Sequence, residues 1–196
     1  MSKSIKSLDS EPENSGAGRV LALFPGALGD FICFLPALRA LSEHGRVDLL
    51  ARSEYAAIAP PNVTTTSLER YEISRLFVAG CEGDERVRRF FAPYRSIYSW
   101  MGSGDPDFIG RLGAAAAGKV ACFPFRASDS RLHAADYYLT CVAARSSGRP
   151  SADLRLQPQD ILWAERFLAG HGYPESKIVA LSPGSGAREK NWPVEF

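Results

Sequence analysis

Two loops of the sequence carry the residue types that could do chemistry. The first is Pro25-Gly26-Ala27-Leu28-Gly29-Asp30, which follows a short apolar run at residues 20–24. Such a run is typical of a strand buried on both faces of a parallel sheet. Ligands of open α/β sheets bind beyond the carboxyl ends of the strands, where this loop would lie. Gly26 and Gly29 allow tight backbone geometry and close approach of a ligand.

Asp30 has two interpretations. A carboxylate at the mouth of a cleft can act as a general base that takes a proton from a hydroxyl group. A carboxylate at this position can also simply cap the N-terminus of the following helix, and physical reasoning alone favours the cap. The loop has neither the GxGxxG pattern of dinucleotide sites nor the GxxxxGK pattern of phosphate loops.

The second loop spans residues 182–193, Ser-Pro-Gly-Ser-Gly-Ala-Arg-Glu-Lys-Asn-Trp-Pro. It joins an apolar run to a proline that suits the first turn of a helix. Backbone N–H groups at such a helix start bind anions, and the small residues Ser185 and Gly186 would let a phosphate approach them. Lys190 adds a positive charge nearby. The alternative is an ordinary turn in which Arg188 and Lys190 are solvated, and the residues do not decide between the two.

Hydrophobic spacing predicts the elements that must position these loops. Strands are expected over residues 20–24, 47–51, 63–68, 96–100 and 119–123, and helices over 28–44, 54–59, 70–94 (one or two), 107–117 and 132–145. Pro36 predicts a kink or a late start of the first helix, because proline disfavours helix at the residue before it. Alternation of strands and helices predicts an α/β domain with a parallel sheet.

The chain changes character after this domain. Residues 1–18 are polar and are predicted to be a disordered tail, residues 19–150 form the N-terminal domain, and a break rich in Ser, Gly and Pro begins at residue 146. Beyond it we expect a helix over 161–168 and a sixth strand over 177–181. Residues 151–196 cannot bury a core of their own, because a single βα unit leaves both sheet edges open. They are predicted to be a linker and the first βα unit of an incomplete second domain.

The composition excludes several classes of protein. With 45% hydrophobic and 23% charged residues the chain is not wholly disordered, and its net charge of +1 lacks the basic excess of a nucleic-acid-binding protein. No apolar run reaches the roughly 20 residues of a membrane-spanning helix. The four cysteines, at 33, 81, 122 and 141, are too dispersed for a zinc or disulfide pattern, which indicates free thiols in a reducing cytosol and no metal site.

Three segments resemble a known family. LFPGALGDFICFLPALRAL is similar to the N-terminal signature of glycosyltransferase family 9, the lipopolysaccharide heptosyltransferase-like enzymes: a strand, a loop ending in Gly-Asp, and an apolar stretch closing in Leu-Pro-Ala-Leu. VALSPGSGAREKNWPVEF is similar to the donor loop of that family, Pro-Gly-Ser-Gly followed by Lys-x-Trp-Pro. A weaker match, His133-Ala134-Ala135-Asp136-Tyr137, resembles a helix start with His and Tyr.

The resemblance implies a GT-B architecture, in which two Rossmann-like domains face each other across a cleft. The N-terminal domain would receive the acceptor at the loop containing Gly26, Ala27 and Gly29, and the C-terminal domain a nucleotide sugar. The implied reaction is inverting and metal-independent, with no cofactor besides the donor: transfer of a sugar, heptose from ADP-heptose, to a lipopolysaccharide-type or other glycan acceptor.

The resemblance also assigns roles to individual residues. Asp30 matches the general base, and Lys190 matches the lysine that holds the donor diphosphate, with Ser185 and Gly186 in the same phosphate loop. His133 is a weaker candidate, for which a polar residue at a helix start is the favoured interpretation.

The sequence departs from the family at its C-terminal end. A later Gly-Pro-x-x-Gly-x-x-His stretch and the acidic residues of the donor site are missing. We therefore expect a fragment that does not turn over by itself, located in the cytoplasm or peripherally at the inner face of the cytoplasmic membrane through transient contact, with no nucleic acid partner. Two alternatives stay open: a GT-B enzyme that uses a UDP- or GDP-linked sugar, and a non-catalytic acceptor-domain module.

Overall fold

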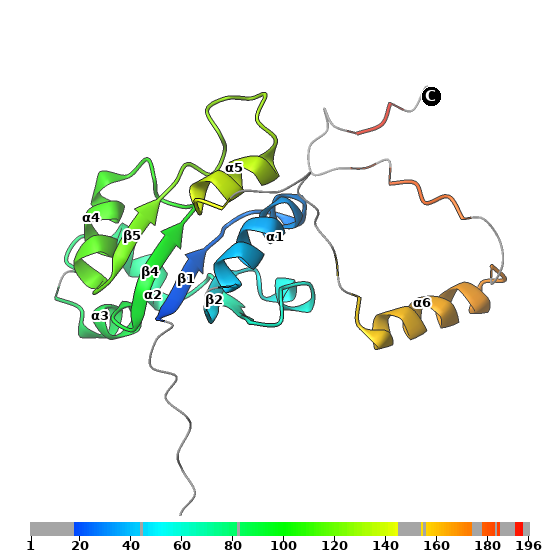
Figure 1. Ribbon diagram of the computed structural model, residues 1–196, viewed down its shortest axis with the longest axis horizontal. Helices are drawn as coiled ribbons and strands as arrows, with labels where there is room; N and C mark the ends of the chain where they lie inside the picture. The colour runs from blue at the N-terminus through cyan, green and yellow to red at the C-terminus, as the bar shows by residue number, and fades with distance from the viewer. Residues whose placement is uncertain are drawn as a thin grey trace, which may run out of the picture. The chain divides into compact units, whose positions relative to one another are not determined.

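The computed structural model describes residues 18–43, 45–81, 83–144, 154, 156–173, 178–182, 184 and 191–193 (Figure 1). The chain divides into two compact units, Met1–Leu154 and Arg155–Phe196. The first unit is a single sheet of parallel strands with helices on both faces, which confirms the predicted α/β class.

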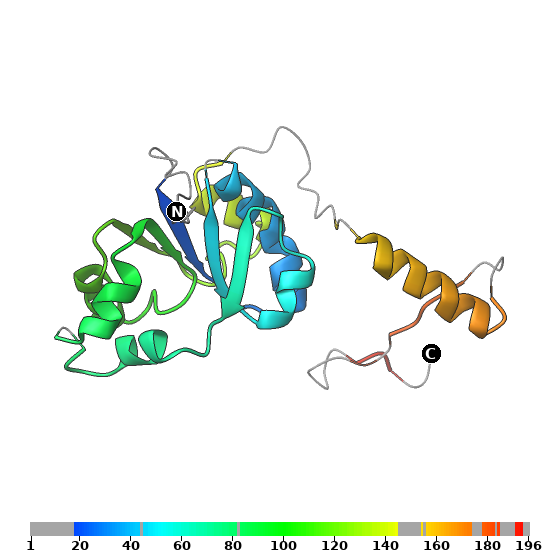
Figure 2. The same ribbon diagram turned by 90° about the horizontal axis from the view of Figure 1, so that it is seen from below.

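The sheet has five strands, β1 (Arg19–Leu23), β2 (Val47–Ala51), β3 (Val63–Ser67), β4 (Tyr94–Ser99) and β5 (Lys119–Cys122). They lie in the order β3-β2-β1-β4-β5, and every neighbouring pair is parallel. Figure 2 shows β2 and β3, in cyan, beside the blue β1. The order reverses at β1, so the sheet has a topological switch point between β1 and β4, where α/β proteins characteristically bind ligands.

Side chains of β1 alternate between two cores, which explains why its sequence is apolar throughout. Val20 and Ala22 pack on one face of the sheet with α1 (Leu28–Ser42), α5 (Ala134–Cys141) and the short helix η1 (Ser53–Ala57). Leu21 and Leu23 pack on the other face. That face is covered by α2 (Tyr71–Ser74), η2 (Arg75–Phe77), α3 (Glu85–Phe91) and α4 (Pro106–Ala115).

An aromatic cluster fixes the chain where β1 ends. The Phe24 ring stacks on the Phe34 ring of α1, with their centroids 4.3 Å apart. Tyr138 of α5 meets Phe24 edge-on at 5.5 Å, and Trp100 meets Phe34 edge-on at 4.6 Å. All four side chains are buried. The loop after β1 therefore starts from a closely packed anchor.

The helices occur where the sequence predicts them, but some of their ends differ. α1 begins at Leu28, as predicted, and continues through Pro36, so the late start that Pro36 suggested is wrong: packing against the sheet and α5 outweighs one missing backbone hydrogen bond. α5 lies inside the predicted 132–145. Its end before residue 145 is explained by Ala143, which adopts a positive φ of 55° just beyond the helix. The segment 70–94 holds two short α-helices, which agrees with the predicted one or two, and a 3-10 turn; its last residue, Tyr94, already belongs to β4.

The second unit contains α6 (Pro158–Gly170). A capping box between Gln157 and Asp160 and a proline in the first turn begin this helix. Residues 178–182 form no strand, so the predicted sixth strand is wrong for this described segment. A strand needs a hydrogen-bonded neighbour, and Ile178, Val179 and Leu181 are each more than half exposed.

Candidate functional site

The loop between β1 and α1 lies at the carboxyl edge of the sheet, as the sequence predicts. Phe24 continues the sheet by donating its backbone N–H to the carbonyl of Leu50 at 2.9 Å. Ala27 is the N-cap residue of α1, with extended φ and ψ of −72° and 173°. Gly26 is buried and Gly29 is exposed. This arrangement places Asp30 in the first turn of α1, as its third residue.

Asp30 does not cap this helix. The N-cap is Ala27, which makes no side-chain capping bond, and the described residues include no backbone N–H that donates to the Asp30 carboxylate. The interpretation of Asp30 as an N-cap is therefore wrong. Its negative charge is still favourable near the positive end of the helix dipole. The Asp30 side chain is 23% exposed and so can be reached from solvent.

A second loop reaches Asp30 from the far side of β4. Arg126, in the loop after β5, places its Nη2 atom 3.6 Å from Oδ1 of Asp30. Phe125 anchors this loop, because its ring lies 5.8 Å from Phe24 and its carbonyl accepts a hydrogen bond of 3.3 Å from the Tyr138 hydroxyl. The Arg126 guanidinium also lies 5.4 Å from the centre of the Phe125 ring.

Sequence reasoning missed Arg126. The available signal was its position directly after a predicted strand, in the run Phe123-Pro124-Phe125-Arg126. Carboxyl ends of parallel strands meet at one edge of the sheet, so a charged residue there can reach the loop after another strand.

The negative charge of Asp30 raises the pKa of two neighbouring groups. Burial and then the Asp30 carboxylate raise the pKa of Tyr138 to about 12. The same two causes raise the pKa of the Cys33 thiol, on the next turn of α1. Tyr138 and Cys33 are therefore both neutral at pH 7.

His133 is the N-cap residue of α5. The backbone N–H of Ala135 donates to its Nδ1 atom at 3.2 Å, and the side chain is exposed. This is the polar helix-start position that sequence reasoning favoured. The other predicted site residues, Ser185, Gly186 and Lys190, lie outside the described residues.

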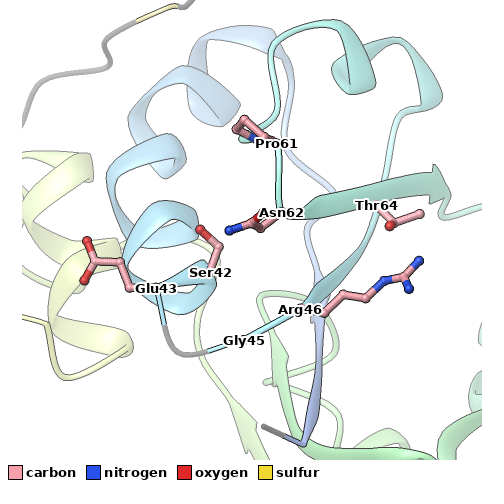
Figure 3. A pocket seen from close by; sticks show the side chains of 7 residues that line it. All are labelled: Ser42, Glu43, Gly45, Arg46, Pro61, Asn62 and Thr64. Carbon is pink, nitrogen blue, oxygen red and sulfur yellow. The ribbon is translucent and has the colours of Figure 1, made fainter. Parts of the chain in front are cut away.

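Two surface depressions lie at opposite edges of the sheet. One, of about 520 Å³, lies at the carboxyl ends of β1, β2 and β3, and its lining includes Pro25, Arg52 and Glu54. The other, of about 490 Å³, lies at the amino ends of β2 and β3, where Ser42 from the end of α1 faces Asn62 (Figure 3). The first depression and Asp30 lie at the same edge of the sheet, the carboxyl edge, where open α/β sheets characteristically bind ligands.

No protein-family model matches the sequence, and no curated protein matches it. Among solved structures, a glycosyl transferase of family 9 from Veillonella parvula is similar with a TM-score of 0.60 and 18% sequence identity, over 91% of this chain and 56% of that one. The chain shares the fold of this family 9 glycosyl transferase over the part that it covers.

A further similar structure is the E. coli heptosyltransferase WaaC with ADP, which has a TM-score of 0.45 and 16% identity over 90% of this chain and 61% of that one. The chain therefore spans 56% and 61% of the lengths of these two proteins. Its parallel sheet agrees with the α/β architecture expected from the resemblance. None of the described helices is both long and apolar enough to cross a membrane.

Proposed function

We propose that this chain supplies the acceptor side of an inverting glycosyltransferase, with Asp30 as the general base. The observation that carries the proposal is the Asp30 carboxylate, which does not cap α1 and lies beside Arg126 at the carboxyl edge of a family 9 fold. A carboxylate on a rigid first turn can take the proton of a sugar hydroxyl as that oxygen attacks.

The proposed reaction forms one bond and breaks one. The acceptor oxygen bonds to the anomeric carbon of the donor sugar while the bond from that carbon to the diphosphate oxygen breaks, with inversion. The acceptor proton goes to Asp30, and the electron pair leaves with the nucleoside diphosphate. Lys190 and the backbone N–H groups of Ser185 and Gly186 would stabilise the charge that develops on the leaving group.

Arg126 has a defined part in this proposal. Its guanidinium neutralises the Asp30 carboxylate only in part, because the Arg126 side chain is 74% exposed and the pair is screened by solvent.

The donor is proposed to be ADP-heptose and the acceptor a lipopolysaccharide-type glycan. The protein is proposed to act in the cytoplasm, with transient contact to the membrane surface that carries such an acceptor.

Donor binding is tested with ADP-, UDP- and GDP-linked sugars, measured by calorimetry on the natural protein that carries these residues. We expect ADP-heptose to bind, and Lys190→Ala to weaken ADP and ADP-heptose together by roughly tenfold or more. Arg166→Ala, which removes an exposed cation of α6, is the control and should leave both affinities unchanged.

Three outcomes count against parts of the proposal. Preferential binding of a UDP- or GDP-linked sugar would replace the donor. Unchanged ADP affinity in Lys190→Ala would remove the role of that lysine. Binding of a glycan without transfer from any donor would favour a non-catalytic module.

A further inference from the structure

The crossover after β2 makes a hydrogen bond to the loop that carries Asp30. The Tyr55 hydroxyl, from η1, donates to the backbone carbonyl of Gly26 at 3.0 Å. Tyr55 is 2% exposed, and its ring stacks on Phe31 of α1 with centroids 4.4 Å apart and planes 15° from parallel. One side chain therefore contacts both the loop and the first helix.

The loop at Gly26 has little room to move. A Cβ atom at Gly26 would lie 2.4 Å from the Phe24 ring and 3.0 Å from the Cβ of Asp30. Gly26 and Asp30 are thus direct neighbours across the first turn, although three residues separate them. A shift of the Gly26 peptide would be transmitted to the Asp30 side chain.

The hydroxyl of Tyr55 is a dependable donor. Burial raises its pKa above the ordinary value, and of the charged neighbours Arg52 opposes this shift while Glu54 and Asp30 add to it. The hydroxyl stays protonated at neutral pH and can hold the carbonyl. If the Tyr55 hydroxyl were removed, the carbonyl of the buried Gly26 would lose its hydrogen bond from the only side-chain donor that it has among the described residues.

We propose that Tyr55 is a positioning residue, which orients the Asp30 carboxylate by holding the Gly26 carbonyl. This inference rests on the proposed function, because it is the general base that Tyr55 positions. Tyr55 itself does not touch the reacting atoms. Small misplacements of a catalytic group cost rate while leaving the binding of the donor intact.

The first experiment needs no turnover. NMR spectra of the 196-residue chain are compared for wild type, Tyr55→Phe and the control Tyr71→Phe. The control removes the hydroxyl of Tyr71, a residue of α2 on the opposite face of the sheet, which donates a hydrogen bond to Asp84. We expect Tyr55→Phe to shift the Ala27 amide, which shares a peptide group with the Gly26 carbonyl, and the Asp30 carboxyl carbon. Tyr71→Phe should move neither. Unmoved resonances in Tyr55→Phe would overturn the proposal.

The second experiment is a double-mutant cycle on turnover in the natural protein that carries these residues. Tyr55→Phe should lower kcat by about 10- to 100-fold with the KM for the nucleotide sugar unchanged. In an Asp30→Asn background the same change should have no further effect, because Tyr55 acts through Asp30. Additive losses would mean that Tyr55 supports the fold alone, and would overturn the proposal.

The two experiments separate this inference from the proposed function. If Asp30→Asn leaves turnover unchanged, the general base is wrong, whatever Tyr55 does. If Asp30→Asn abolishes turnover while Tyr55→Phe equals wild type, the general base stands and the role of Tyr55 is overturned.

Discussion

Nη2 of Arg126 lies 3.6 Å from Oδ1 of Asp30, which joins the loop after β5 to the loop after β1 across the intervening strand β4. The pair is the contact that brings a cation to the proposed general base. Because the arginine is largely exposed, the pair belongs to the surface of the site rather than to the core.

Removing Arg126 should therefore cost little stability. We expect Arg126→Ala to change the free energy of unfolding by less than about 1 kcal/mol, as is usual for exposed ion pairs. Urea denaturation of the wild type and of Arg126→Ala measures this difference in the free energy of unfolding. A loss of several kcal/mol would show that the pair holds the two loops together, and would assign Arg126 a structural role.

Gly26 and Gly29 should respond oppositely to the same substitution. Gly26→Ala is expected to destabilise the protein by about 1–3 kcal/mol, because the new methyl group meets the buried Phe24 ring. Gly29→Ala is the matched control: nothing lies within 4 Å of its Cβ position, and it sits in the first turn of α1. Alanine there should be neutral or stabilising by up to about 1 kcal/mol. Equal unfolding free energies for the two variants would contradict the packing of the loop.

Glu72 should make stability depend on acid pH. This carboxylate of α2 is 5% exposed and accepts hydrogen bonds from Nε of Arg86 at 2.8 Å and Nε of Arg70 at 3.3 Å. Burial raises the pKa of Glu72, but hydrogen bonds from the backbone, Arg86 and Arg70 outweigh it and hold the pKa below its ordinary value. The stabilisation that ionised Glu72 adds to the folded state is therefore fully present above the pKa of an unfolded Glu, about 4.3. It is lost as the pH falls through the lower pKa that Glu72 has in the folded state.

Glu72→Gln should lower the free energy of unfolding at pH 7 by about 1–3 kcal/mol and reduce its fall below pH 4.5. Glu85→Gln is the control, because Glu85 is exposed and its pairs with Arg88 and Arg89 are 3.7 and 3.8 Å long. Urea denaturation at several pH values compares the variants. An unchanged acid dependence in Glu72→Gln would rule out this linkage.

The strands of the sheet could be predicted from the sequence, whereas the contacts between loops could not. The continuous apolar run at residues 20–24 and the mostly apolar segment 47–51, which contains Asp48, both predict strands, and both strands occur within one residue of the expected positions. The late start suggested for α1 was wrong because local rules weigh Pro36 without the packing that surrounds the helix. The sixth strand was predicted from an apolar run alone, although a strand also depends on its partner.

The candidate site follows the same division. Asp30 was found because its loop, its glycines and its place after a strand are all local features. Arg126 and Tyr55 reach that loop only through the order of the strands, which places the segments after β5 and β2 near β1. No spacing in the sequence encodes those distances.

The most direct test of the account is the turnover of Asp30→Asn in the natural protein that carries these residues, measured together with its donor affinity and unfolding free energy. We predict a fall in kcat of roughly 10²–10⁴, with donor affinity unchanged and stability altered by no more than about 1 kcal/mol. Wild-type turnover, or a loss of turnover matched by a loss of folding, would contradict Asp30 as the general base.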